Sequence, residues 1–182
     1  AQTVTANITA SGSTTFCSGG SVTLTSNSSS GNNWSPGGLS TQSIVVTTPG
    51  TYTLTVNNGS GCSATSAPKT IIVNQLPTLP VLTANASTNI CAGNTVILSS
   101  SYASGNTWLP NGQTTKDIGV NNSGSYTVKY TDVNGCSSVS APVDVTVNPL
   151  SAAPTITANS PITFCAGDSV TLTSSAITGN IW

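Results

Sequence analysis

Short runs of alternating apolar and polar residues recur along the chain, and most of them are rich in β-branched side chains. Alternation with a period of two is typical of half-buried strands, and the Gly, Asn, Ser and Pro residues between the runs are typical of turns. No stretch has the period of an amphipathic helix. The pattern predicts an all-β sandwich of two antiparallel sheets. The expected strands are 21–26, 43–47, 51–57 and 69–73, followed by 95–100, 117–120, 125–131 and 143–147.

The whole pattern repeats after 74 residues (91 − 17). This spacing separates Cys17, Cys91 and Cys165, and likewise Trp34, Trp108 and Trp182. Roughly 29 of the 74 aligned positions of the first two copies are identical, and a fixed period of this length indicates an array of one folded unit. We expect unit 1 at 1–76, unit 2 at 77–150 and the N-terminal part of an incomplete unit 3 at 151–182.

Two proline-marked segments, 74–80 and 148–154, connect the units. Because proline fixes φ and favours extended backbone, we expect short semi-rigid spacers here and not flexible tethers. Their equal lengths suit a repeated geometry between units. Recent duplication, with no time for insertions, explains the equal lengths as well.

The composition excludes several function classes. Only seven side chains carry a formal charge and the net charge is −1, so no basic surface is expected that could bind nucleic acid. The chain lacks His, Arg, Glu and Met, and its four Asp residues do not cluster in sequence. We therefore expect no enzyme activity, no metal site and no cofactor. No apolar run is long enough for a membrane span, and no signal peptide opens the chain. The missing Met and the stop at Trp182 suggest a window cut from a longer protein.

Aromatic residues at fixed positions are expected to anchor each core. Trp34 follows Leu24 by ten residues (34 − 24), the separation typical of the second and third strands of an immunoglobulin-like sandwich. Tyr52 lies in the Gly-x-Tyr-x-apolar pattern of a tyrosine corner, and Leu54 occupies the place of the second inter-sheet Cys of antibody domains. An alternative role for the Trp residues is an exposed platform for sugars. The predicted core residues are Leu24, Trp34, Tyr52 and Leu54 in unit 1, and Leu98, Trp108, Tyr126 and Val128 in unit 2.

The five cysteines, Cys17, Cys62, Cys91, Cys136 and Cys165, lack metal-ligand spacing and favour disulfides, which places the chain outside the cytoplasm. Counting favours bonds within units, Cys17–Cys62 and Cys91–Cys136. In the expected topology, however, Cys17 and Cys62 lie at opposite poles, because the six steps from Tyr52 to Asn58 alone span roughly 20 Å. A disulfide needs Cα atoms within about 7 Å. Geometry therefore slightly favours an inter-unit bond between Cys17 and Cys136.

Four motifs in order, 15–26 (TFCSGGSVTLTS), 31–34 (GNNW), 50–56 (GTYTLTV) and 61–67 (GCSATSA), are similar to the Ig-like repeats of large secreted surface proteins of Bacteroidota. These proteins include gliding-motility-type adhesins exported by the type IX system. The resemblance covers the whole chain and implies a stalk or spacer at the bacterial outer cell surface. Asp168-Ser169-Val170 resembles an O-glycosylation tripeptide of that phylum, which implies Ser169 as a candidate; a plain turn into a strand is the alternative.

The sequence thus predicts tandem immunoglobulin-like antiparallel β-sandwich repeats in an extracellular surface fibre, stalk or adhesin shaft. Such an array is a semi-rigid mechanical spacer whose units contact mainly their neighbours. The expected partners are neighbouring repeats of the same longer chain, other surface proteins, or copies of itself in a fibre. Two alternatives are a glycan-binding module and an appendage of a larger secreted enzyme.

Overall fold

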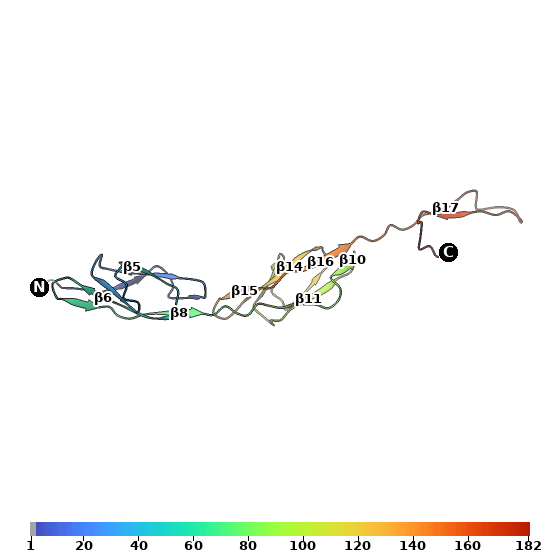
Figure 1. The fold of residues 1–182 in the computed structure, drawn as a ribbon. Coiled ribbons are helices and arrows are strands. Elements are labelled where there is room, and N and C mark those ends of the chain that lie inside the picture. The colour runs from blue at the N-terminus through green and yellow to red at the C-terminus, as the bar shows by residue number, and fades with distance from the viewer. Residues whose placement is uncertain (1–2) are drawn as a thin grey trace.

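The computed structural model describes residues 3–182 as three parts that follow one another along an elongated molecule (Figure 1). Unit 1 lies at the N-terminal end, unit 2 continues it end to end, and residues 156–182 lie beyond a connecting segment. The regular secondary structure of the described residues consists of strands. The expected all-β sandwich is confirmed.

Each complete unit has eight strands. Those of unit 1 are β1 (Ile8–Ala10), β2 (Thr15–Cys17), β3 (Val22–Ser26), β4 (Asn32–Ser35), β5 (Ser43–Val46), β6 (Gly50–Asn57), β7 (Ser63–Thr65) and β8 (Lys69–Asn74). Those of unit 2 are β9 (Leu82–Ala84), β10 (Asn89–Cys91), β11 (Val96–Ser100), β12 (Asn106–Leu109), β13 (Asp117–Val120), β14 (Gly124–Thr131), β15 (Ser137–Val139) and β16 (Val143–Asn148). The third part contains β17 (Ile156–Ala158) and β18 (Leu172–Ser174).

Two sheets form each sandwich. In unit 1 a three-stranded sheet, β1-β3-β5, packs against a five-stranded sheet of order β2-β8-β6-β4, in which β7 also pairs with β6. Unit 2 repeats both sheets with β9 to β16. The expectation of purely antiparallel sheets is wrong at one edge, since β2 runs parallel to β8 and β10 parallel to β16. The reason is that the chain leaves β1 in one sheet and crosses to the other, where β2 lies alongside the last strand.

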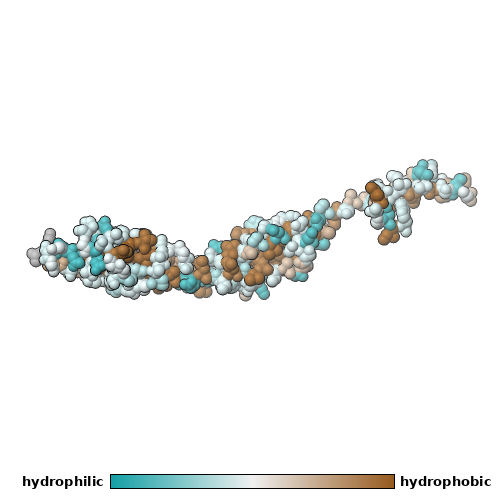
Figure 2. All heavy atoms as spheres, in the orientation of Figure 1, coloured by the Kyte–Doolittle hydropathy of each residue, from teal (hydrophilic) through white to brown (hydrophobic). Residues whose placement is uncertain are grey.

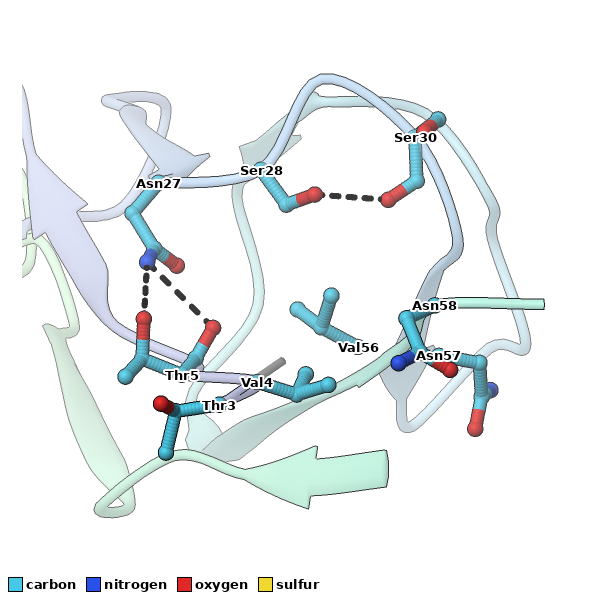
Figure 3. Close-up of a pocket in the computed structure, with 9 residues that line it drawn as sticks. All are labelled: Thr3, Val4, Thr5, Asn27, Ser28, Ser30, Val56, Asn57 and Asn58. Carbon is cyan, nitrogen blue, oxygen red and sulfur yellow. Dashed lines mark hydrogen bonds between the residues drawn. The ribbon is translucent and has the colours of Figure 1, made fainter. Parts of the chain in front are cut away.

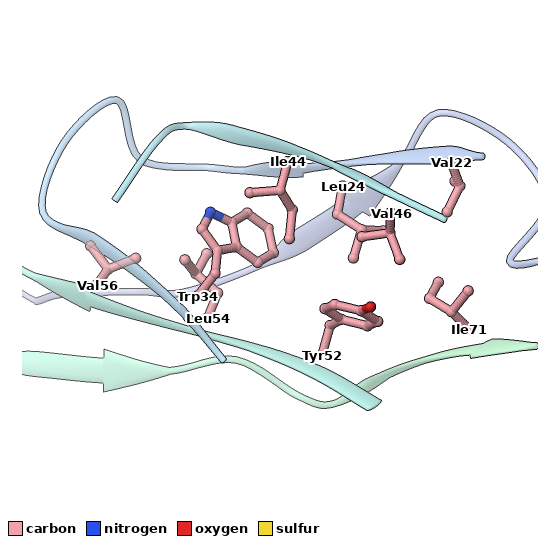
Figure 4. Packing of buried hydrophobic residues seen from close by; sticks show 9 residues of the cluster. All are labelled: Val22, Leu24, Trp34, Ile44, Val46, Tyr52, Leu54, Val56 and Ile71. Atoms are coloured by element: carbon pink, nitrogen blue, oxygen red, sulfur yellow. The ribbon is translucent and has the colours of Figure 1, made fainter. Parts of the chain in front are cut away.

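The core of unit 1 lies between these sheets and consists of alternating inward-facing side chains (Figure 4). Its members are Val22, Leu24, Trp34, Ile44, Val46, Tyr52, Leu54, Val56 and Ile71. Trp34 is 0% exposed, and its indole N–H donates to the carbonyl of Thr41 at 2.9 Å. Trp108 is equally buried in unit 2 and donates to the carbonyl of Thr115 at 2.9 Å. Both Trp residues are therefore core residues, and their interpretation as a sugar platform is wrong.

The tyrosine corner is present in both units. The Tyr52 hydroxyl donates to the Thr48 carbonyl at 3.2 Å, and the Tyr126 hydroxyl donates to the Asn122 carbonyl at 3.0 Å. Each bond ties the start of the longest strand to the loop before it, while the ring itself packs in the core. The corner thus closes one end of the sandwich without a disulfide.

The third part has no comparable core among its described residues. Its two strands pair with each other, and core-type side chains remain at the surface, including Phe164 and Trp182, the latter 71% exposed. Hydrophobic atoms are visible on the surface of this part in Figure 2. Exposed core surface is what the sequence predicts for the front half of a sandwich.

Replacing Trp34 with Ala should destabilise unit 1 by about 3–5 kcal/mol, because the substitution empties the largest space in its core and removes the bond to Thr41. Calorimetric unfolding measures this as a lowered transition for unit 1 beside an unchanged transition for unit 2. The control is Val45→Ala on the outer face of β5, where the side chain is 68% exposed and the effect should stay within about 0.5 kcal/mol. A Trp34→Ala protein as stable as the Val45→Ala protein would contradict this account of the core.

Candidate functional site: the junction between the units

A disulfide joins Cys17 of unit 1 to Cys136 of unit 2, with Cα atoms 5.6 Å apart. This inter-unit pairing is the one that strand geometry favours over cysteine counting. The pairings within units are wrong: Cys62 and Cys91 are exposed free thiols. Each complete sandwich holds its two cysteines at opposite poles, so only cysteines of adjoining units come close enough to bond.

Cys17 is held by the parallel edge of unit 1. It ends β2 opposite Asn74, the last residue of β8, and the following amide of Ser18 donates to the Asn74 carbonyl at 2.8 Å. The chain then turns back, because the amide of Gly20 donates to the Cys17 carbonyl at 2.9 Å. Since β8 leads directly into the connection between the units, this ladder places the Cys17 thiol beside the point where the chain enters unit 2.

Cys136 is held by a tight loop that starts at Asp132. One carboxylate oxygen of Asp132 accepts the amides of Asn134 at 2.9 Å and of Cys136 at 2.8 Å. The Asp132 amide in turn donates to the Cys136 carbonyl at 2.9 Å. Cys136 is 0% exposed. The loop therefore presents a preformed sulfur that the neighbouring unit covers.

The connection between the units is also bonded to unit 2. The carbonyl of Thr78 accepts the hydroxyl of Ser138 at 3.0 Å and the hydroxyl of Tyr102 at 3.0 Å. Pro80, two residues further on, is buried. These contacts restrict a connection that proline already stiffens, as the sequence predicts.

Tyr102 reaches the connection because a polar network and a ring stack position it. The side chain of Asn106, itself bonded to Ser100, donates to the Tyr102 carbonyl at 2.9 Å. The ring of Tyr102 stacks on that of Tyr130, with centroids 3.6 Å apart and planes inclined by 5°. Between them Gly105 has φ +77°, and a Cβ there would lie 2.6 Å from the Thr131 carbonyl oxygen. Only glycine lets the loop approach the end of β14 this closely.

The junction thus combines one covalent bond with several hydrogen bonds. A disulfide typically contributes about 2–4 kcal/mol to stability, and each hydrogen bond about 0.5–1.5 kcal/mol. The disulfide also indicates an oxidising compartment outside the cytoplasm. The arrangement has no evident reaction chemistry; what it can do is restrain the motion of one sandwich against the next.

Sequence reasoning missed the ring stack, because Tyr102 and Tyr130 stand 28 residues apart (130 − 102) with no shared motif. The structure brings them together because Asn106 on β12 pairs with Tyr130 on β14. A usable signal was present. Serine and asparagine recur at positions 26 and 32 in unit 1 and at 100 and 106 in unit 2. This repeated pair predicts a common loop at each pole.

The remaining candidate residues lie outside the junction. Cys165 is an exposed free thiol in the third part, and Ser169 is exposed there as well, so its glycosylation stays a prediction. Among residues 3–182, no group of three or more His, Cys, Asp or Glu side chains is arranged to hold a metal ion. That same part of the chain also contains no helix long and apolar enough to cross a membrane.

No family model and no curated protein sequence matches the chain. Among solved structures, it is similar to a chain of the crystal structure of a mouse coronavirus receptor-binding domain complexed with its murine receptor. The match has 14% sequence identity and a TM-score of 0.42, and it covers 79% of this chain and 100% of that one. A likeness at this level carries no argument about function.

Replacing Tyr102 with Phe should loosen the connection, because the variant keeps the ring stack but loses the hydroxyl that binds Thr78. We expect a cost of about 0.5–1.5 kcal/mol in unfolding free energy and faster motion of residues 75–80 in NMR relaxation. Tyr130→Phe is the matched control, since its hydroxyl does not bond to Thr78. Equal behaviour of the two variants would show that the Tyr102 hydroxyl does not restrain the connection.

Proposed function

We propose that the chain is a structural repeat array in an extracellular surface fibre, stalk or adhesin shaft, where it acts as a semi-rigid spacer. The observation that carries this proposal is the disulfide between Cys17 and Cys136, which links one sandwich to the next. The sequence resemblance to repeats of bacterial surface proteins supports the location at the outer cell surface. The role is mechanical: the units hold a distal part of a larger assembly away from the membrane.

The position of the disulfide supports this role through the path that tension takes. When the two ends of the chain are pulled apart, tension passes from Cys17 directly to Cys136, which are separated by 119 positions in sequence. The backbone between them forms a closed loop outside the covalent load path. Nearly all core strands, from β3 to β14, lie in this loop. Tension therefore cannot extend these strands while the disulfide is intact.

The elongated arrangement also suits a spacer. Unit 1 and unit 2 stand end to end and their connection is bonded to unit 2 at Thr78, so each unit adds to the length of the molecule (Figure 1). A surface with few charges, whose solubility comes from Ser, Thr and Asn, suits a passive role. A glycan-binding module is less well supported, because Trp34 and Trp108 are fully buried and the Tyr102 hydroxyl is engaged by the connection.

Single-molecule stretching between the two termini tests the proposed load path. The oxidised chain should reach a full extension about 400 Å shorter than the Cys17→Ser variant, because 119 residues at about 3.5 Å each stay enclosed. The matched control is Cys62→Ser, which removes a free thiol and should extend like the parent chain. A parent chain that extends as far as the Cys17→Ser variant would contradict the proposal, as would a difference near 150 Å, the value expected for a Cys17–Cys62 bond.

A further inference from the structure

The pole of unit 1 that faces away from unit 2 carries an open counterpart of the junction. Cys62 occupies the position in unit 1 that Cys136 occupies in unit 2, 74 residues later (136 − 62). Cys136 is bonded and fully buried, whereas Cys62 is a free exposed thiol. The two cysteines therefore differ in what covers them.

The loop that presents Cys62 has the same hydrogen bonds as the bonded loop. The side-chain oxygen of Asn58 accepts the amides of Ser60 at 2.9 Å and of Cys62 at 3.2 Å, as Asp132 does in unit 2. The Asn58 amide donates to the Cys62 carbonyl at 3.1 Å. Cys62 is thus already held in the conformation that Cys136 has when it is bonded to a neighbouring unit.

A groove of about 390 Å³ lies at this pole of unit 1 (Figure 3). Val4, Ser28, Val56 and Asn58 contribute to its lining. The residues 74 positions after the first three are Thr78, Tyr102 and Tyr130, which form the bonded connection and the ring stack of the junction. Small side chains therefore leave a hollow in unit 1 where unit 2 is filled and bonded to the chain that arrives from its neighbour.

The complementary half is present at the far pole of unit 2. Cys91 ends β10 opposite Asn148, and the amide of Ala92 donates to the Asn148 carbonyl at 2.8 Å. The amide of Asn94 donates to the Cys91 carbonyl at 3.1 Å. These contacts match those that position Cys17 at the junction. Cys91 is nevertheless a free, exposed thiol beside the segment that leaves unit 2.

We propose that Cys62 and Cys91 are the two open halves of the inter-unit disulfide, and that a second copy of this chain supplies the missing partner. Cys62 of one copy bonds to Cys91 of the next, with the unit 2 pole of one seated on the unit 1 pole of the other. The inference rests on the proposed function. Because the two surfaces differ, the contact is heterologous and produces open head-to-tail chains of molecules, not closed pairs.

Charge does not oppose this contact. The sequence has no Asp, Glu, Lys or Arg before Lys69, so the side chains of the unit 1 pole carry no formal charge. Seating a second copy there buries no unpaired charge of unit 1, which would be the costliest penalty of docking. The observed junction shows that a pole of this kind accepts its neighbour closely enough to exclude water from the sulfur of Cys136.

The bond forms by thiol–disulfide exchange with a small-molecule disulfide such as oxidised glutathione. The Cys91 thiolate attacks one glutathione sulfur, which forms a mixed disulfide and releases one glutathione thiol. The Cys62 thiolate of the second copy then attacks the Cys91 sulfur and releases the other glutathione thiol. Two protein thiols are oxidised, one glutathione disulfide is reduced, and the two protons end on the two glutathione molecules.

The test uses the full chain with single free thiols. The C62S/C165S variant keeps only the Cys91 thiol, the C91S/C165S variant keeps only the Cys62 thiol, and both retain the Cys17–Cys136 disulfide. Each variant alone and an equal mixture, at the same total concentration, are incubated with oxidised glutathione and analysed on non-reducing gels. The mixture should form about tenfold more covalent dimer than either variant alone, because docking raises the effective concentration of the matching thiols.

Trypsin cleavage after the three Lys residues should then recover the fragment 1–69 bonded to the fragment 70–116. The control is the same mixture in denaturant, where unfolded poles cannot dock and the excess of dimer should vanish. Equal dimer yields in the mixture and in the separate samples would overturn the inference, as would no dimer in the mixture. Either result leaves the stretching experiment on Cys17–Cys136 unaffected, so failure of the inference and failure of the proposed function are distinguishable.

Discussion

The covalent bond between Cys17 and Cys136 determines how the two sandwiches can move relative to each other, because the other contacts of the junction are individual hydrogen bonds. A hydrogen bond worth about 1 kcal/mol opens and closes spontaneously, whereas a disulfide opens only by exchange with another thiol. The hydrogen bonds to Thr78 restrict the connection, and the disulfide keeps the two poles together when those bonds break. Both depend on folded units, since isolated loops would not hold the two sulfurs at a defined distance.

The sandwich itself explains why the disulfide lies between units. In antibody domains a disulfide joins the two sheets through the core, but here Leu24 and Leu54 fill that space and both are fully buried. The cysteines have moved to the poles, one at the parallel edge formed by β2 and β8 and one in the loop before β15. A strand the length of β6 separates these poles, which prevents bonding within a unit. The same separation makes each unit a link with one sulfur at either end.

The residues that pack between the sheets were the most predictable, because strand alternation, the buried Trp and the tyrosine corner are local patterns with one physical meaning each. Trp34 and Tyr52 are in the core for the reasons that the sequence suggests. The cysteine pairing was harder, since counting and geometry favoured different answers. The parallel pairing of β2 and the stacking of Tyr102 on Tyr130 were not predicted. Both depend on where a loop carries the chain in space, which no period in the sequence encodes.

Peptide mapping without reduction tests the central claim, the disulfide between Cys17 and Cys136, most directly. After the free thiols are alkylated, trypsin cleaves only after Lys69, Lys116 and Lys129. Cys17 and Cys62 stay in fragment 1–69, Cys91 lies in 70–116, and Cys136 lies in 130–182. The account predicts fragment 1–69 bonded to fragment 130–182, with tandem mass spectrometry placing the bond at Cys17 and Cys136. An internal Cys17–Cys62 bond within fragment 1–69 would contradict it.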